Sequence, residues 1–231
     1  MKKAIGIIGG MGPMATCDLM KKIIDNTVAE KDQEHIRLFV DSNTNIPDRT
    51  AAILGKGADP RPAMIESAVK LQAMGADLLI VPCNTAHYFR DDVQSAVDVP
   101  ILNMQLETAR ALHRQGITAA AVLATDGTVQ SGLYDRALKA AGITPVYPDA
   151  REQKLIMSLI YDYVKAGKEF TELDKIHAMV QHLQAQGAQG LILGCTELPI
   201  AFEPWQLPVP TFDPTLILAK AAIREAGYQV K

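Results

Sequence analysis

Two cysteines occupy the same setting at two places in the chain. Residues 75–83 read GADLLIVPC and residues 187–195 read GAQGLILGC, so each copy begins with Gly-Ala and reaches cysteine at its ninth position. A thiolate can act as a base, and one thiol on each side of a carbon atom would allow a proton to leave one face and return to the other. The repeat therefore favours a site built on Cys83 and Cys195 over two inert buried cysteines.

The residues that follow each cysteine could support such a site. Each cysteine lies where an aliphatic run ends, and we expect a strand before it and a helix after it. Ligands bind at the carboxyl ends of parallel strands, and a helix start offers free N–H groups and a positive field that would stabilise a thiolate. The neighbouring polar side chains that could contact a substrate or a thiol are Asn84, Thr85, His87, Thr196 and Glu197.

A glycine-rich turn follows the first aliphatic run. Residues 10–15 read GMGPMA, which satisfies the dinucleotide-binding pattern G-x-G-x-x-A, with Gly10 and Gly12 as its glycines. Asp41, which ends the next predicted strand, lies about 30 residues further on, whereas the pattern expects an acidic residue after about 20. The turn could instead let the backbone approach a small anion. A nucleotide-binding oxidoreductase therefore stays open as an alternative.

The elements that must position these residues alternate along the chain. Residues 4–8, 36–40, 78–81, 119–123 and 191–193 read as buried strands, and amphipathic helices lie between them, such as the one with Leu173, Ile176, Val180 and Leu183 on one stripe. This alternation predicts an α/β fold with parallel sheets. Residues 122–128, which contain Thr125, repeat the strand-and-turn opening of the first half.

The repeat predicts two pseudo-symmetric α/β domains, each with a parallel sheet flanked by helices and with the active site in the cleft between them. We place one domain at residues 1–103 plus 209–231 and the other at 104–208, with the last helix, residues 214–226, packing back on the first domain. Residues 41–62 show no sustained period and suggest a functional loop that carries Arg49, although a solvated surface arginine fits equally well.

Composition narrows the class of function. The chain has 231 residues, a net charge of -3 and three cysteines, which gives no general attraction to nucleic acid or anionic lipid. No apolar stretch approaches the ~20 residues needed to cross a bilayer, so we expect a cytoplasmic protein. Without a CxxC or a Cys/His cluster at zinc spacing, we expect no metal site and reduced thiols. Cys17, within the first helical pattern, reads as core packing.

Five motifs taken together resemble the aspartate/glutamate racemase superfamily, and specifically its aspartate racemase branch. They run over nearly the whole chain and are GGMGPMAT (9–16), NIPDRT (45–50), PCNTAH (82–87), VKAG (164–167) and GCTELP (194–199). Glutamate racemases typically open with an Asp-Ser pair and carry histidine where this chain has Glu197. The presence of Cys83 favours the two-thiol branch over relatives with threonine at that position.

This resemblance implies a cofactor-independent racemase, usually a homodimer, that interconverts L- and D-aspartate between two domains. Carried over by motif, Cys83 and Cys195 match the catalytic bases, and Arg49 and Lys165 match the cations that hold the side-chain carboxylate. The groups around the amino acid are Met11, Asn84, Thr85 and Thr196, with Gly10, Gly12, Thr125, Glu197 and His87 as supporting residues. The alternatives are a glutamate or broad-specificity racemase, a hydantoin racemase, a maleate isomerase and a non-catalytic amino-acid-binding protein.

Overall fold

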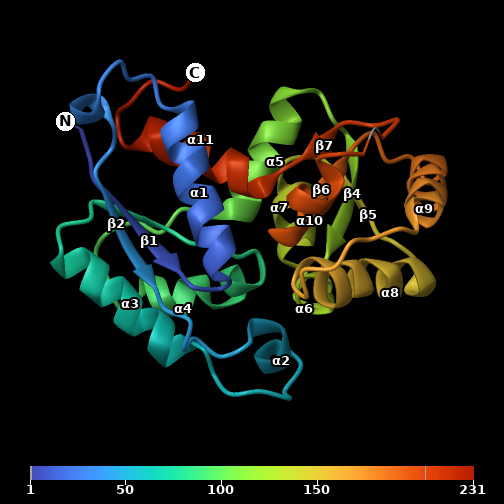
Figure 1. The fold of residues 1–231 in the computed structure, drawn as a ribbon, viewed down its shortest axis with the longest axis horizontal. Coiled ribbons are helices and arrows are strands. Elements are labelled where there is room, and N and C mark those ends of the chain that lie inside the picture. The colour runs from blue at the N-terminus through green and yellow to red at the C-terminus, as the bar shows by residue number, and fades with distance from the viewer. Residues whose placement is uncertain (1, 206) are drawn as a thin grey trace. The chain divides into compact units, whose positions relative to one another are not determined.

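The fold is an α/β architecture in two compact units. A computed structural model describes residues 2–205 and 207–231. The first unit comprises Met1–Glu107 and Thr215–Lys231, and the second comprises Thr108–Pro214. Figure 1 shows the elements of both units. Within the described ranges, no helix is both long and apolar enough to cross a membrane.

The first unit contains a three-stranded parallel sheet in the order β2-β1-β3, with Ile5 of β1 beside Leu38 of β2 and Leu78 of β3. The central strand β1 is buried along its whole length. The strands are β1 (Ile5–Gly9), β2 (Leu38–Ser42) and β3 (Leu78–Ile80), and the helical elements are α1 (Pro13–Asn26), η1 (Asp32–Glu34), α2 (Arg49–Ile53), α3 (Arg61–Ala73), η2 (Thr85–Phe89), α4 (Arg90–Gln94) and α11 (Pro214–Glu225). α5 (Met104–Arg114) begins in this unit and ends in the second.

Helices cover both faces of this sheet because side chains alternate along β1. Ile5 and Ile7 share a core with α1 and α11, whereas Ile8 shares the other core with α3 and α4. The two helix layers are visible on either side of the sheet in Figure 1. The chain therefore returns α11 to the core of the first unit, as the sequence predicts.

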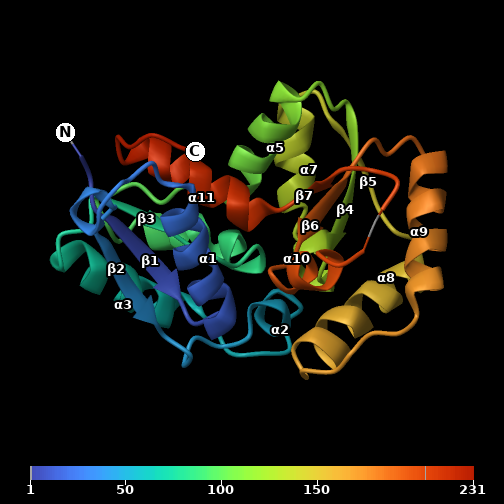
Figure 2. The same cartoon turned by 45° about the horizontal axis from the view of Figure 1, so that its top comes forward.

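The second unit contains a four-stranded parallel sheet in the order β5-β4-β6-β7. One face packs against α8 and α9, which Figure 2 shows beside the sheet. On the other face Tyr134 of α7 is buried close to Gly194 of β6. The strands are β4 (Ala119–Ala124), β5 (Thr144–Val146), β6 (Leu191–Gly194) and β7 (Thr211–Phe212), and the helical elements are α6 (Asp126–Gln130), α7 (Leu133–Ala140), α8 (Ala150–Ser158), the π-helical turn η3 (Leu159–Val164), α9 (Leu173–Ala185) and α10 (Glu197–Phe202).

The two units repeat one strand order. β1 lies between β2 and β3 in the first sheet, and β4 lies between β5 and β6 in the second. The strand before Cys83 and the strand before Cys195 therefore each pair with the first strand of their unit, although β6 also pairs with β7. This confirms the predicted pair of α/β units with parallel sheets.

The Gly-Ala pair that opens each copy of the sequence repeat terminates a helix. Gly75 follows α3 and Gly187 follows α9, and both adopt a φ of 98°. In each copy the glycine N–H bonds to the carbonyl three residues back, and the alanine N–H, from Ala76 or Ala188, bonds to the carbonyl five residues back. This is the Schellman arrangement, which requires a left-handed residue that glycine adopts without strain. The Gly-Ala start of each repeat therefore ends a helix, whereas the other end carries the candidate catalytic cysteine.

Several sequence expectations need correction. β5 and β7 are missing from the predicted strands, because β5 contains Pro145 at a sheet edge and β7 has only two residues. Residues 41–62 are not without regular structure, since they include the end of β2, the short helix α2 and the start of α3. Cys17 is exposed rather than packed in the core, because the buried stripe of α1 consists of Ala15, Thr16, Leu19 and Ile23.

Candidate active site

The glycine turn lies at the carboxyl end of β1. Gly10 has a φ of 87°, and its N–H donates to Thr16 Oγ1 at 2.9 Å, while the Thr16 hydroxyl donates to the Gly12 carbonyl at 3.1 Å. Met11, between the two glycines, is buried. The turn is therefore closed by a threonine one turn into α1. Thr16, which belongs to the GGMGPMAT motif, therefore supports the turn.

Cys83 lies beside this turn. β1 pairs with β3 as far as Ile7 beside Ile80, and Met11 of the turn belongs to the same buried cluster as Cys83. Cys83 is buried, and its N–H donates to the Val81 carbonyl at 2.9 Å. The first cysteine and the glycine turn thus leave neighbouring strands at the same edge.

The segment after Cys83 differs from the predicted helix. It is η2, a five-residue 3-10 turn with Asn84 as its N-cap, so it supplies a weaker helix field than a regular helix would. Asn84 and Thr85 are both buried. Gln105 of α5 donates from Nε2 to the Asn84 carbonyl at 3.2 Å. Gln105 therefore fixes the residue after the cysteine, and no local sequence signal indicated it.

His87 is held by backbone next to this turn. Its Nε2 lies 3.3 Å from the Val81 carbonyl oxygen. Burial lowers the pKa of His87 to about 4, an effect that the Val81 hydrogen bond opposes and that the charge of Arg90 reinforces. The ring is therefore neutral near pH 7 and braces the segment around Cys83.

Arg49 lies at the first position of α2, which contacts η2. Its Nη1 donates to the carbonyls of Ile46 at 3.1 Å and Pro47 at 2.9 Å. Its Nε is buried without a hydrogen-bond partner in the described structure. A buried guanidinium donor without an acceptor is costly, so Arg49 is equipped to bind an anion.

In the second unit, Cys195 directly follows β6. Ala124 of β4 faces Gly194 of β6, so Thr125 and Cys195 leave adjacent strands, as Gly10 and Cys83 do in the first unit. Thr125 is buried and caps α6 through its hydroxyl, which accepts from the Thr128 N–H. The predicted supporting role of Thr125 thus has a structural counterpart in a helix cap.

A carboxylate contacts the second thiol. Cys195 Sγ donates to Glu197 Oε2 at 2.9 Å, and the Thr196 hydroxyl donates to the same oxygen at 3.0 Å. Lys165, which follows η3, places Nζ 3.8 Å from Glu197 Oε1 and 4.5 Å from the centre of the Tyr161 ring. Four of the predicted site residues of this unit therefore meet in one cluster.

The protonation of Cys195 differs from the sequence expectation. Burial and the negative charge of Glu197 raise the pKa of the Cys195 thiol well above its usual value, and Lys165 opposes this only in part. The expected stabilisation of a thiolate by the following helix is therefore wrong for this cysteine. α10 has only six residues, and burial together with the nearby carboxylate outweighs its field.

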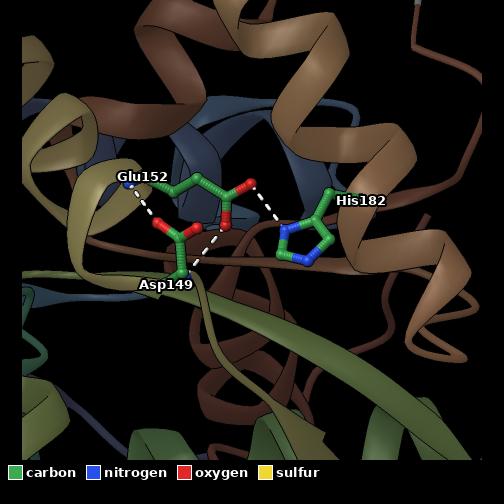
Figure 3. A group of neighbouring side chains, drawn as sticks. All are labelled: Asp149, Glu152 and His182. Atoms are coloured by element: carbon green, nitrogen blue, oxygen red, sulfur yellow. Dashed lines mark hydrogen bonds and ion pairs between the residues drawn. The ribbon is translucent and has the colours of Figure 1, made fainter.

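Away from these residues, Asp149, Glu152 and His182 bring three potential metal-ligating atoms within 4.8 Å of one another (Figure 3). Asp149 and Glu152 form a capping box at the start of α8, in which each side chain accepts from the other's backbone N–H. Glu152 Oε1 also pairs with His182 Nδ1 of α9 at 2.7 Å. The group therefore caps α8 and ties it to α9.

Two α/β units with matched cysteines at the strand ends define the class of protein. The chain belongs to the Asp/Glu/Hydantoin racemase family, whose sequence model matches residues 8–222. It is thus a member of a family of racemases, which are isomerases.

Individual relatives cover nearly the whole chain. The broad specificity amino-acid racemase RacX of Bacillus subtilis (strain 168) is 29% identical over 228 residues, which are 95% of this chain and 96% of that protein. The aspartate racemase of Picrophilus torridus matches with a TM-score of 0.84 and 32% identity over 99% of this chain and 96% of the other. An aspartate racemase homologue from Pyrococcus horikoshii OT3 matches with a TM-score of 0.80 and 26% identity over 97% and 99%.

Proposed function

We propose that the protein is a cofactor-independent racemase that interconverts L- and D-aspartate by proton transfer between its two cysteines and the α-carbon. The observation that carries this proposal is the equivalent placement of Cys83 and Cys195, each after the third strand of its unit in chain order, which pairs with the first strand of that unit. The likeness to aspartate racemases supports the choice of substrate. We propose that the two units act as the two domains of a protomer that works as a homodimer.

In this mechanism, one cysteine is a thiolate and the other a thiol. The thiolate forms an S–H bond as the Cα–H bond breaks, and the thiol delivers its own proton to the opposite face of Cα. The electron pair left on Cα is shared with the substrate carboxylate, which becomes more negative. Each well-placed donor to that charge is worth about 3 kcal/mol in other enzymes, so several are needed. Asn84, Thr85, Thr196 and the amides of the Gly10–Gly12 turn would supply them.

Arg49 and Lys165 would hold the side-chain carboxylate. Arg49 has a buried Nε without a partner, and a guanidinium binds carboxylates through paired hydrogen bonds. Lys165 lies at the rim of the Cys195 cluster. A second cation near the reacting centre favours a diacid over a neutral amino acid.

A second candidate is a racemase of broad specificity, which the likeness to RacX favours. One methylene in a pocket changes discrimination by only ~1–3 kcal/mol, so glutamate is the first competitor to test. Chiral chromatography of aspartate, glutamate, alanine and lysine after incubation with the protein separates these functions. Turnover of alanine or lysine at a rate equal to that of aspartate would favour the broad function.

The proposed reaction is tested by proton NMR of L- and D-aspartate in deuterated buffer. The Cα proton signal should disappear with either enantiomer as racemisation proceeds. Cys83→Ala and Cys195→Ala should each abolish the interconversion while near-ultraviolet circular dichroism stays unchanged. Near-normal racemisation by either variant would exclude the two-thiol scheme.

A further inference from the structure

Glu197 makes three polar contacts, one of which is with the Cys195 thiol. One carboxylate oxygen, Oε2, accepts from the thiol at 2.9 Å and from the Thr196 hydroxyl at 3.0 Å. The other oxygen, Oε1, faces the ammonium group of Lys165 at 3.8 Å. The Glu197 side chain is 14% exposed and that of Lys165 is 35% exposed, so bulk water screens the carboxylate only in part.

We infer that Glu197 is a positioning residue for Cys195, holding the thiol proton in the resting protein and accepting it when Cys195 has to act as the base. This inference rests on the proposed racemase function for its catalytic part. The statement about the resting thiol depends only on the contacts within the second unit.

The proton transfer balances within the pair. The Sγ–H bond breaks as an Oε2–H bond forms, so a thiol and a carboxylate become a thiolate and a carboxylic acid with the same total charge of -1. The Thr196 hydroxyl, already within reach of Oε2, can turn its proton towards solvent or substrate when Oε2 becomes protonated. The step needs no oxidant, reductant or additional reactant.

Lys165 acts on Cys195 in the direction opposite to Glu197. The positive charge of Lys165 lowers the pKa of the Cys195 thiol, whereas the negative charge of Glu197 raises it.

The charged and titratable groups around the thiol are few in the described part of the chain. Glu197 belongs to the same segment, Lys165 follows η3, and Tyr134 of α7 interacts electrostatically with Cys195. Burial raises the pKa of Tyr134, which stays neutral. Asp213 and Tyr147 act on Tyr134 rather than on the sulfur. The carboxylate and the ammonium are therefore the two charges that decide the state of Cys195.

The test measures alkylation of Cys195 by iodoacetamide in the full-length native protein, with peptide mass spectrometry to follow that cysteine separately from Cys17 and Cys83. Glu197→Gln removes the negative charge with little change of shape. A neighbouring charge shifts a pKa by about 1–3 units, and the weaker nucleophilicity of a more acidic thiol cancels about half of the gain. We expect Cys195 in Glu197→Gln to react about tenfold faster at pH 7.5.

Two further variants test the opposite change of charge and provide a control. Lys165→Gln removes the opposing cation and should make Cys195 react more slowly than in the wild type. Glu203→Gln removes an exposed carboxylate just beyond the same helix and should leave the rate unchanged. An unchanged or slower rate in Glu197→Gln, together with a wild-type rate in Lys165→Gln, overturns the inference.

Racemisation provides the second readout. In Glu197→Gln the acid limb of the kcat/KM profile should move to lower pH and the maximal value should fall at least about tenfold, whereas Glu197→Asp, which keeps the carboxylate, should recover part of both. If the wild type fails to racemise aspartate while the alkylation pattern holds, the proposed function is wrong and the thiol–carboxylate pair stands. If racemisation is normal and Glu197→Gln leaves its pH profile unchanged, the proton-accepting role is wrong.

Discussion

The glycine turn gives the sharpest stability prediction, through Gly10→Ala. Gly10 has a φ of 87°, where a β-carbon costs about 1 kcal/mol. A Cβ at this position would also lie 2.4 Å from both the carbonyl carbon and the carbonyl oxygen of Asn43. These are backbone atoms that no rotamer can move, and overpacking of this kind costs about 1–3 kcal/mol. The total loss of unfolding free energy is about 3 kcal/mol.

Gly75→Ala is the matched control. Gly75 has a φ of 98°, and a Cβ there would meet no atom within 4 Å. This variant therefore carries the backbone cost of about 1 kcal/mol without the collision.

Thermal unfolding of both variants separates the two effects. In a protein of this size, 1 kcal/mol lowers Tm by about 2–4 °C. Gly10→Ala should melt about 6–12 °C below the wild type and Gly75→Ala about 2–4 °C below it. Racemisation by Gly10→Ala should be lost well below its Tm, because Asn43 and the Met11 segment must move apart. Equal melting temperatures for the two variants would refute the argument from the Asn43 contact.

Two other predictions concern charge. The pKa of buried His87 is lowered to about 4, so the unfolded chain binds a proton more readily than the folded one, and about 3 kcal/mol of stability should be lost as pH falls from 6.5 to 4. In urea unfolding at pH 7, 5.5 and 4, His87→Gln should lack this part of the decline, and parallel curves for variant and wild type would contradict it. Arg49→Ala should lower kcat/KM for aspartate by about 10–150-fold through the loss of a charged hydrogen bond worth about 1.5–3 kcal/mol, with little effect on any alanine turnover. An unchanged preference for aspartate over alanine would exclude that role.

Local sequence pattern predicted the parts of the fold that local pattern controls. The continuous aliphatic runs of β1, β3, β4 and β6 are buried on both faces, and such runs have few other uses. The stripe on α9 likewise became its buried face. Strand β5 was not predicted from the sequence because it contains Pro145. Pairing at a sheet edge depends on the neighbouring strand more than on the residues themselves.

The site was predicted as a set of residues and not as a set of contacts. The motifs indicated Cys195, Glu197 and Lys165, but whether the field of a short helix or the charge of a carboxylate dominates at the sulfur depends on a distance of 2.9 Å that only the fold defines. Gln105 contacts the Asn84 carbonyl from 21 residues away, and nothing local marks it. The prediction that Cys17 packs in the core was wrong because residues one or two positions apart on a helix lie on different faces, and Cys17 is next to the buried stripe rather than in it.

The distribution of deuterium at low conversion tests the central claim most directly. L-Aspartate is incubated with the wild-type protein in deuterated buffer, and the reaction is stopped before about a tenth of the substrate has reacted. The two enantiomers are then separated, and the deuterium content of each is measured by mass spectrometry. Two thiols on opposite faces predict that the D-aspartate formed carries deuterium at Cα while the remaining L-aspartate keeps its proton. Deuterium appearing equally in both enantiomers, or in neither, would contradict a reaction shared between Cys83 and Cys195.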